Sequence, residues 1–228
     1  MKRKSFLKLI ILFLSLMLPT LVSAAEVITP AEAEKWAESK GEEILDILSD
    51  KNLQRKYKEL DTILYNDVDL DNAAKFAMGK YWKTMTPEQK QRYVPLFKQY
   101  ISSLYKSYPL DLGKGNINFA ISRVVPTKSG VDVFCAISLN GSAKDKTAAD
   151  KSQGLFSVLF ALAKNNGRLQ VRDIKIGESS LLLAFRSRFY QMIYNDSDGE
   201  IDWFLDDLQT ITADNEEKNE QKLEDAAF

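Results

Sequence analysis

The sequence predicts an α+β fold in which a curved, four-stranded antiparallel sheet packs against several helices, with an apolar cavity between the layers. Apolar residues recur at helical spacing over residues 30–108, the apolar period changes to two from Asn116, and helical spacing returns from Ser180. Four strands in hairpin succession are typical of an antiparallel meander rather than of a parallel nucleotide-binding sheet. Helices on one face of such a sheet leave a concave space between the two layers.

Residues 1–25 have the three parts of a secretory signal peptide. The basic stretch 1–4 precedes an apolar segment at 9–18, and residues 22–25 supply small side chains for cleavage. The apolar segment is shorter than the about 20 residues that a membrane-spanning helix needs. An uncleaved membrane anchor is the alternative. We therefore expect an exported, soluble protein that begins near residue 26.

The composition disfavours most enzyme chemistry. The 228 residues include no histidine and one cysteine. The lack of histidine removes the usual general base, the commonest zinc ligand and every His-dependent catalytic triad. Cys135 alone cannot form a disulfide within the chain or a thiolate metal cluster, and we interpret it as a small buried hydrophobic residue. We expect neither an enzyme nor a bound metal.

The charge distribution separates a nearly neutral body from an acidic C-terminal segment. Without residues 1–25 the net charge is −5, of which −4 belongs to residues 213–228. The predicted single domain, residues 26–212, is therefore almost neutral, which argues against a nucleic-acid-binding surface and against electrostatic capture by anionic lipid. We predict that residues 213–228 form a disordered acidic tail. An extension of the last helix is the alternative.

Two capping boxes predict where the long N-terminal helices begin. The box at 29–32, with proline at the first helical position, predicts a helix over about 30–49. The box at 86–89 opens a helix whose apolar face is unusually wide and aromatic, and Pro95 is expected to kink it. Two shorter helices are predicted between these, at 53–65 and after the acidic segment 67–71.

The second half of the chain is predicted to contain the sheet. The predicted elements are strands at 117–122, 131–139, 155–164 and 169–176 and helices at 180–194 and 200–210. Gly130 marks the turn between the first two strands. Asn-Asn-Gly at 165–167 is a strong hairpin signal between the last two.

Three motifs resemble functional sites, but each has a simpler structural interpretation. Ser103 and Lys106 match Ser-x-x-Lys, yet the companion motifs of serine enzymes of that type are missing. Residues 196–199 resemble part of a calcium loop, but carboxylates are missing from its first and twelfth ligand positions. The alternate acids of 67–71 could bind a cation or act as an acid/base pair; we predict helix caps instead.

Two blocks of the sequence resemble a known family. In residues 69–105 an acidic helix start leads to Gly-Lys-Tyr-Trp, a Thr-Pro-Glu-Gln box and an aromatic helix that ends in tyrosine. In residues 171–189, Val-Arg-Asp-Ile-Lys-Ile continues through Ser180 to Phe-Arg-Ser-Arg-Phe, and the helix 199–208 follows. These blocks are similar to the MlaC (toluene-tolerance) family of periplasmic phospholipid-binding proteins. The turn at 177–180 departs from the family pattern, because its glycine is displaced by one position.

The resemblance implies a soluble periplasmic carrier that performs no reaction. Such a carrier moves diacyl phospholipid between an outer-membrane lipoprotein/porin complex and an inner-membrane transport complex with MCE-domain rings and an ABC-type ATPase, and thereby maintains outer-membrane lipid asymmetry. The implied cargo is phospholipid, with no other cofactor and no nucleic acid, and we expect a monomer. A periplasmic interaction or scaffold module with the same fold and no lipid is the alternative. A carboxylate-dependent enzyme is a third hypothesis.

The acyl chains of such a cargo need an apolar slot. About 30 methylenes at about 0.8 kcal/mol each cost about 24 kcal/mol in water, and burial removes most of that cost. We predict that the slot lies between the sheet and the aromatic helix that follows residue 86. The predicted lipid contacts are Phe97, Tyr100, Ile101, Leu104, Val133, Phe156, Val158 and Phe160. Candidate headgroup or partner contacts, with solvated helix faces as the alternative, are Lys98, Lys106, Arg186 and Arg188.

Overall fold

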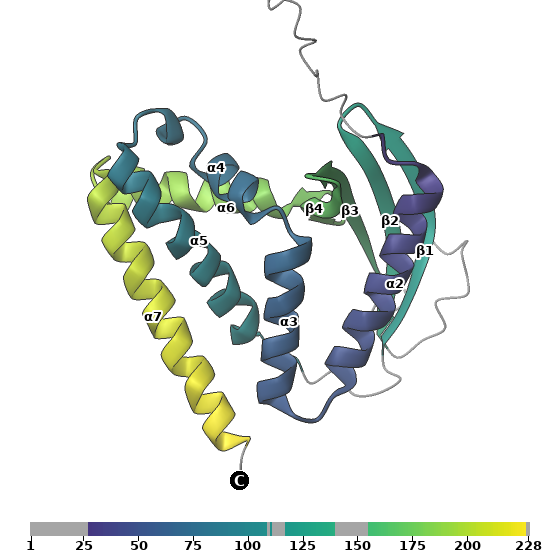
Figure 1. Cartoon of the computed structure of the whole chain (residues 1–228). Helices are drawn as coiled ribbons and strands as arrows, with labels where there is room; N and C mark the ends of the chain where they lie inside the picture. Colours follow the sequence, from purple (N-terminus) through teal and green to yellow (C-terminus); the bar gives the residue numbers. More distant parts are fainter. Residues whose placement is uncertain (1–26, 109, 111–116, 140–154, 227–228) are drawn as a thin grey trace, which may run out of the picture.

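The computed structural model describes residues 27–108, 110, 117–139 and 155–226, and has the α+β architecture that the sequence predicts (Figure 1). The helices are α2 (Pro30–Ser49), α3 (Leu53–Asp67), α4 (Leu70–Met78), η1 (Tyr81–Lys83), α5 (Pro87–Ser107), α6 (Leu181–Gln191), η2 (Met192–Asp196) and α7 (Ile201–Asp225). The strands are β1 (Ile117–Thr127), β2 (Gly130–Leu139), β3 (Leu155–Asn165), β4 (Arg168–Ile176) and β5 (Ser179–Ser180). Among the helices described here, none combines the length and apolar character needed to cross a membrane.

The sheet is antiparallel and has five strands in the order β1-β2-β3-β4-β5, where the sequence predicts four. The additional strand, β5, is a two-residue segment that folds back on β4, so that Lys175 pairs with Ser180 and Ile176 with Ser179. Two residues are too few to show period-two alternation, and for this reason β5 has no signal in the sequence.

Hydrogen bonds at the helix N-termini explain where the helices begin. Thr86 Oγ1 accepts a hydrogen bond from Gln89 N, and Gln89 Oε1 accepts one from Thr86 N, which forms the predicted capping box of α5. Asp69 accepts a hydrogen bond from Asn72 N at the start of α4, which confirms the cap interpretation for this acid. α5 continues through Pro95 without ending. Local side-chain contacts therefore set these boundaries.

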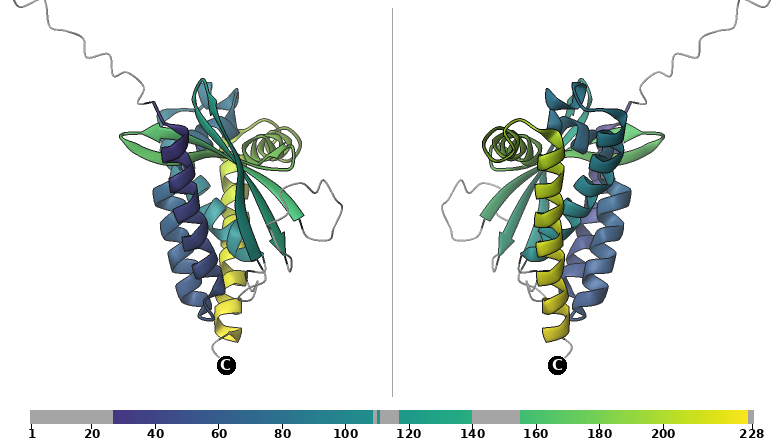
Figure 2. Two further views of the ribbon diagram at one scale, coloured as in Figure 1. Left: turned by 90° about the vertical axis from the view of Figure 1, so that its right-hand side faces the viewer. Right: turned by 90° about the vertical axis from the view of Figure 1, so that its left-hand side faces the viewer.

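The buried apolar residues form a helical core and a sheet core. The helical core lies among α4, α5, α6 and α7, and its rings Tyr93, Phe97, Tyr100, Phe189 and Phe204 are almost fully buried. The Phe189 ring packs edge-on against Phe97 and Phe204, with ring centroids 6.1 and 5.2 Å apart. Figure 2, in which α6 is seen end-on, shows that α6 runs across the direction of α7. The sheet core lies between α2 and the sheet.

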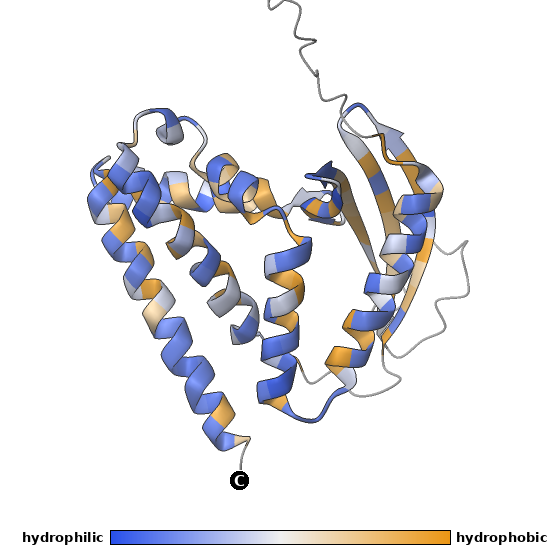
Figure 3. Ribbon diagram, in the orientation of Figure 1, coloured by the Kyte–Doolittle hydropathy of each residue, from blue (hydrophilic) through white to orange (hydrophobic). Residues whose placement is uncertain are grey.

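Helix α7 extends to Asp225, so the prediction of a disordered tail from residue 213 is wrong for the part of this segment that the structure describes. This part of α7 is strongly hydrophilic (Figure 3), as the composition indicates. Asn219 is nevertheless buried, and its Nδ2 donates a hydrogen bond to the Ser103 carbonyl oxygen of α5 at 2.9 Å. Composition predicts the polarity of the segment but not the neighbouring helix that orders it.

We expect Lys222→Met to lower the free energy of unfolding by about 1–2 kcal/mol. The Lys222 ammonium donates hydrogen bonds to the carbonyl oxygens of Lys106 and Ser107, at 3.1 and 2.6 Å. These carbonyl groups lie at the C-terminal end of α5, where intrahelical donors are missing, and methionine cannot replace the ammonium. Lys218→Met is the matched control, because Lys218 is exposed on the same helix. Urea denaturation measures both variants, and equal losses would contradict a capping role for Lys222.

Candidate functional site

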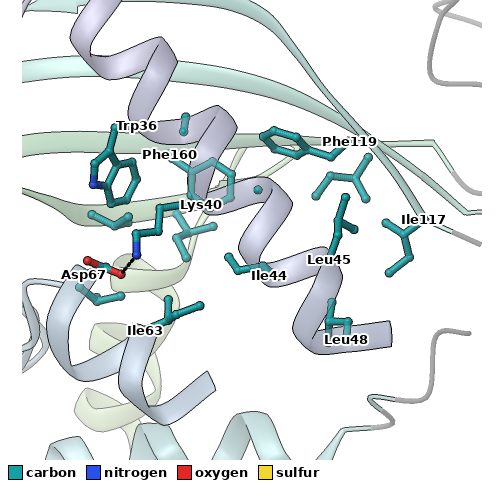
Figure 4. A pocket seen from close by; sticks show the side chains of 16 residues that line it. Trp36, Lys40, Ile44, Leu45, Leu48, Ile63, Asp67, Ile117, Phe119 and Phe160 are labelled. Atoms are coloured by element: carbon teal, nitrogen blue, oxygen red, sulfur yellow. Dashed lines mark ion pairs between the residues drawn. The ribbon is translucent and has the colours of Figure 1, made fainter. Parts of the chain in front are cut away.

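An apolar cavity of about 310 Å³ lies between α2, the C-terminal part of α3 and one face of the sheet (Figure 4). Its lining is apolar except for Lys40 and Asp67. The residues from α2 are Trp36, Ala37, Lys40, Gly41, Ile44, Leu45 and Leu48. The residues from α3 and just after it are Ile63, Asp67 and Val68, and those from the sheet are Ile117, Phe119, Ile137, Phe160, Val171 and Ile174.

The sequence spacing of the lining residues explains why they converge. Along α2 they recur every three or four positions from Trp36 to Leu48, which places them on one side of the helix. On the sheet, Phe119 of β1 lies directly opposite Ile137 of β2. Opposing residues in an antiparallel pair share a face, so both side chains face α2. The cavity is therefore bounded by one helical face and one face of the sheet.

Gly41 allows β1 to approach α2 closely. A Cβ atom at this position would lie 2.5 Å from the Phe119 Cε1 atom, so a side chain here would displace the ring.

Lining residues such as Ile44 and Phe119 are only partly buried, whereas Phe97 of the helical core is 1% exposed. Apolar atoms that border empty volume lack van der Waals partners. An apolar ligand in the cavity would supply those contacts.

One end of the cavity carries an ion pair, which is drawn in Figure 4. The Lys40 Nζ atom is 2.8 Å from a carboxylate oxygen of Asp67 and 2.7 Å from one of Glu43. Burial by itself lowers the pKa of Lys40, but the hydrogen bonds to Asp67 and Glu43 and the negative charges of these two acids together raise the pKa above its ordinary value. Lys40 is therefore a cation at the edge of the apolar lining.

A polar hollow adjoins this charged end. It shares Trp36 and Asp67 with the cavity, and its lining also includes Lys35 and Arg168. In the part of the chain that the structure describes, no group of three or more His, Cys, Asp or Glu side chains is placed to hold a metal ion. The site combines an apolar interior with charged groups at one end. This arrangement suits a molecule with apolar chains and a polar end.

The cavity lies at a different place from the slot that the sequence predicts. Of the eight predicted lipid contacts, only Phe160 lines the cavity. Phe97 and Tyr100 are buried in the helical core, and Ile101 and Leu104 pack against that core. The wall opposite the sheet is formed by α2 and α3, not by α5. The apolar period of α5 identifies its buried face, but the period does not tell which elements cover that face.

The remaining three predicted contacts lie on strands beside the cavity. Val133 and Val158 are buried in the sheet, and Val133 lies opposite Phe160. Phe156 is 46% exposed and lies opposite Ile137, which lines the cavity. Because opposing residues share a face, Phe156 continues the apolar face of the sheet beyond the cavity.

The four predicted headgroup or partner contacts lie on α5 and α6, and none of them lines the cavity. Lys98 and Lys106 form ion pairs with acids of α4 and α3, at 2.9 and 2.5 Å. The Arg186 guanidinium lies 3.6 Å from the centre of the Phe76 ring. Arg188 is exposed on α6. Contact of these four side chains with a headgroup or a partner stays a prediction.

The predicted site lacks the residues that α2 contributes. The apolar face of this helix predicts burial, and burial alone does not separate a cavity wall from a packed core. One feature of the sequence does indicate that α2 forms a cavity wall. Lys40 and Gly41 interrupt the apolar face between Trp36 and Ile44, and a charged residue beside a glycine on a buried helix face indicates incomplete packing.

The fold and the site define an α+β protein whose apolar cavity lies between a pair of helices and an antiparallel sheet. Its fold is similar to the phospholipid-binding protein from Ralstonia solanacearum, solved in complex with a phospholipid, with a TM-score of 0.63 and 19% sequence identity over 80% of this chain and 98% of that chain. The sequence model of the family described as MlaC protein matches residues 38–210. The chain belongs to the MlaC family, which confirms the resemblance predicted from its motifs. None of the curated proteins compared with the chain matches it.

Proposed function

We propose that this protein is a soluble periplasmic phospholipid carrier that holds acyl chains in the cavity between α2, α3 and the sheet. The proposal rests mainly on one observation, an apolar cavity that ends at charged side chains. Membership of the MlaC family and a similar fold solved with phospholipid support this choice of ligand. The chains would lie inside the cavity, and the phosphate group would lie near Lys35, Lys40 and Arg168.

The apolar face of the sheet extends the space available to the chains. The cavity volume of about 310 Å³ is at the lower end of the range of about 300–1,000 Å³ for ligand pockets. Phe156 and Ile176 are 46% and 49% exposed, and their strand register places them on the face that carries Phe160. We expect long chains to continue over these two residues, because contact there removes further apolar surface from water.

The carrier role also includes transfer between two membranes. We propose that the protein exchanges phospholipid with an outer-membrane lipoprotein/porin complex and with an inner-membrane complex that contains MCE domains and an ATPase, as its family membership suggests. A bilayer and the cavity both keep acyl chains from water, so transfer between them is nearly balanced in free energy. Net direction then comes from the partner complexes, and the carrier binds and releases lipid without a reaction.

Native mass spectrometry of the protein purified from the periplasm tests the carrier function. We expect a population heavier than the polypeptide by the mass of one phospholipid, and we expect organic extraction to remove this added mass. Lipid analysis of the extract would identify the headgroup and the chains. A bare polypeptide that also takes up no lipid from liposomes would overturn the proposal and favour a scaffold module with an empty cavity.

A further inference from the structure

A second hollow, the basic pocket, lies between α4, η1, β4 and α6. Its volume is about 740 Å³. Five of its lining residues are cationic and none is acidic; the cations are Lys75, Lys80, Lys83, Arg172 and Arg186. α4 and α6, which lie side by side in Figure 1, bring Lys75 and Arg186 together although they are far apart in the sequence. The function proposed above does not use this pocket.

The turn after α4 holds the basic pocket in shape. Gly79 has φ +50°, and a Cβ atom there would collide with the Tyr190 hydroxyl oxygen. The Lys80 N–H donates a hydrogen bond to this hydroxyl at 2.7 Å, which fixes the turn against α6. Arg186 Nε donates a hydrogen bond to the Phe76 carbonyl oxygen at 2.9 Å, with its guanidinium stacked on the Phe76 ring. The positions of the two aromatic residues and the arginine are therefore specified by contacts.

The five cations of the basic pocket differ from other cations of the protein in their acidic partners. None of them forms an ion pair with a carboxylate in the described ranges of the chain, whereas Lys40, Lys98 and Lys106 each have one within 3 Å. Cations that share a hollow without acids create a positive potential, and this potential attracts anions. The near-neutral charge of the whole domain conceals this local feature. This face can therefore attract anionic lipid although the domain as a whole is nearly neutral.

We propose that the basic pocket docks the protein on the anionic surface of a bilayer by contacting lipid phosphate groups. Exposed Phe76 lines the pocket together with Trp82 and Tyr190, and tryptophan and tyrosine are enriched where membranes meet water. Three of the five cations are lysines. Lysine is depleted at protein–protein interfaces but is as effective as arginine near an anionic lipid surface, which favours a membrane over an acidic protein partner.

Flotation with lipid vesicles tests the docking proposal. The protein is expressed with its own N-terminal segment, so that cells process it naturally, and is mixed with phosphatidylcholine vesicles that contain either no anionic lipid or about 30% phosphatidylglycerol. We expect binding to the anionic vesicles alone, and we expect Lys75→Glu/Lys80→Glu/Lys83→Glu to weaken it by about 100-fold. Lys51→Glu/Lys58→Glu/Lys218→Glu is the matched control, with the same charge change at exposed positions outside the pocket. It is expected to bind within about twofold of the unmodified protein.

Three results would overturn the proposal. Equal weakening by both triple variants would show a nonspecific charge effect, and equal binding to both vesicle types would show that lipid charge plays no part. Binding of inorganic phosphate without binding to anionic vesicles would show a free-anion site.

Thermal melting shows whether each variant is folded. If the pocket variant does not fold, the single variants Lys75→Glu and Lys83→Glu provide the comparison. The docking test is also repeated with Ile44→Trp, whose side chain fills part of the apolar cavity. This repeat separates membrane docking from cargo binding.

Discussion

Ile44→Asp is expected to weaken phospholipid binding by about 100-fold or more. Ile44 lines the cavity from α2 and is partly buried, so the variant places a carboxylate against the acyl chains. Aspartate is too short to carry its charge from the lining into water, and desolvation of a carboxylate without full compensation is costly. Lys40, one turn earlier, can pair with the new carboxylate, which helps the unloaded protein to fold. Lipid content after purification and uptake from fluorescent-lipid liposomes measure the loss.

Gln54→Asp is the matched control for the cavity variant, because it adds the same charge at an exposed position of α3. We expect it to retain lipid at the level of the unmodified protein. Ile44→Trp adds volume without charge and is expected to reduce lipid content as well, since it fills part of the cavity. Normal lipid content in folded Ile44→Asp and Ile44→Trp would place the acyl chains elsewhere.

Phe189→Ala is expected to lower the free energy of unfolding by about 3–5 kcal/mol. Phe189 is fully buried, and its ring contacts those of Phe97, Tyr100 and Phe204. The truncation removes a large buried surface and leaves a void in a well-packed core. Molecules that remain folded are expected to bind phospholipid normally, because Phe189 does not line the cavity. Urea denaturation gives the stability loss, and native mass spectrometry of the folded fraction gives the lipid occupancy.

Phe119→Ala is expected to affect lipid binding more than stability, which is the reverse of the effect expected for Phe189→Ala. Phe119 lines the cavity and is partly buried, so its truncation is expected to cost less stability than Phe189→Ala but to weaken lipid binding by about tenfold. The two variants remove the same side chain from two environments. A loss of lipid with Phe189→Ala, and none with Phe119→Ala, would place the chains in the helical core and contradict the assignment of the two regions.

The sequence predicts the elements of this fold well, because their signals are local. The capping box at 86–89 forms in the structure, and the first long helix has the predicted limits Pro30–Ser49. The hairpin signal at 165–167 joins β3 and β4 as expected. Each signal depends on hydrogen bonds or backbone conformations within a few residues. Such signals need no knowledge of the rest of the molecule.

The sequence does not show where the cavity lies, because that position depends on contacts between distant segments. The wide aromatic face of α5 is covered by α6 and α7, and the periodicity of α5 contains no information about these partners. Strand alternation gives the face of Phe160, which lines the cavity, but the same alternation gives equal weight to buried Val133. The order of the last part of α7 likewise depends on α5, through Asn219.

The three tryptophans give the protein a set of built-in optical reporters. Trp36 lines the apolar cavity, Trp82 lines the basic pocket, and Trp203 is 55% exposed on α7. With the other two replaced by phenylalanine, each tryptophan reports on one location. Phospholipid with brominated chains would quench Trp36 when cargo enters, and bromines near the headgroup region of a bilayer would quench Trp82 during docking. Cargo loading and membrane contact can therefore be timed separately in the unlabelled protein.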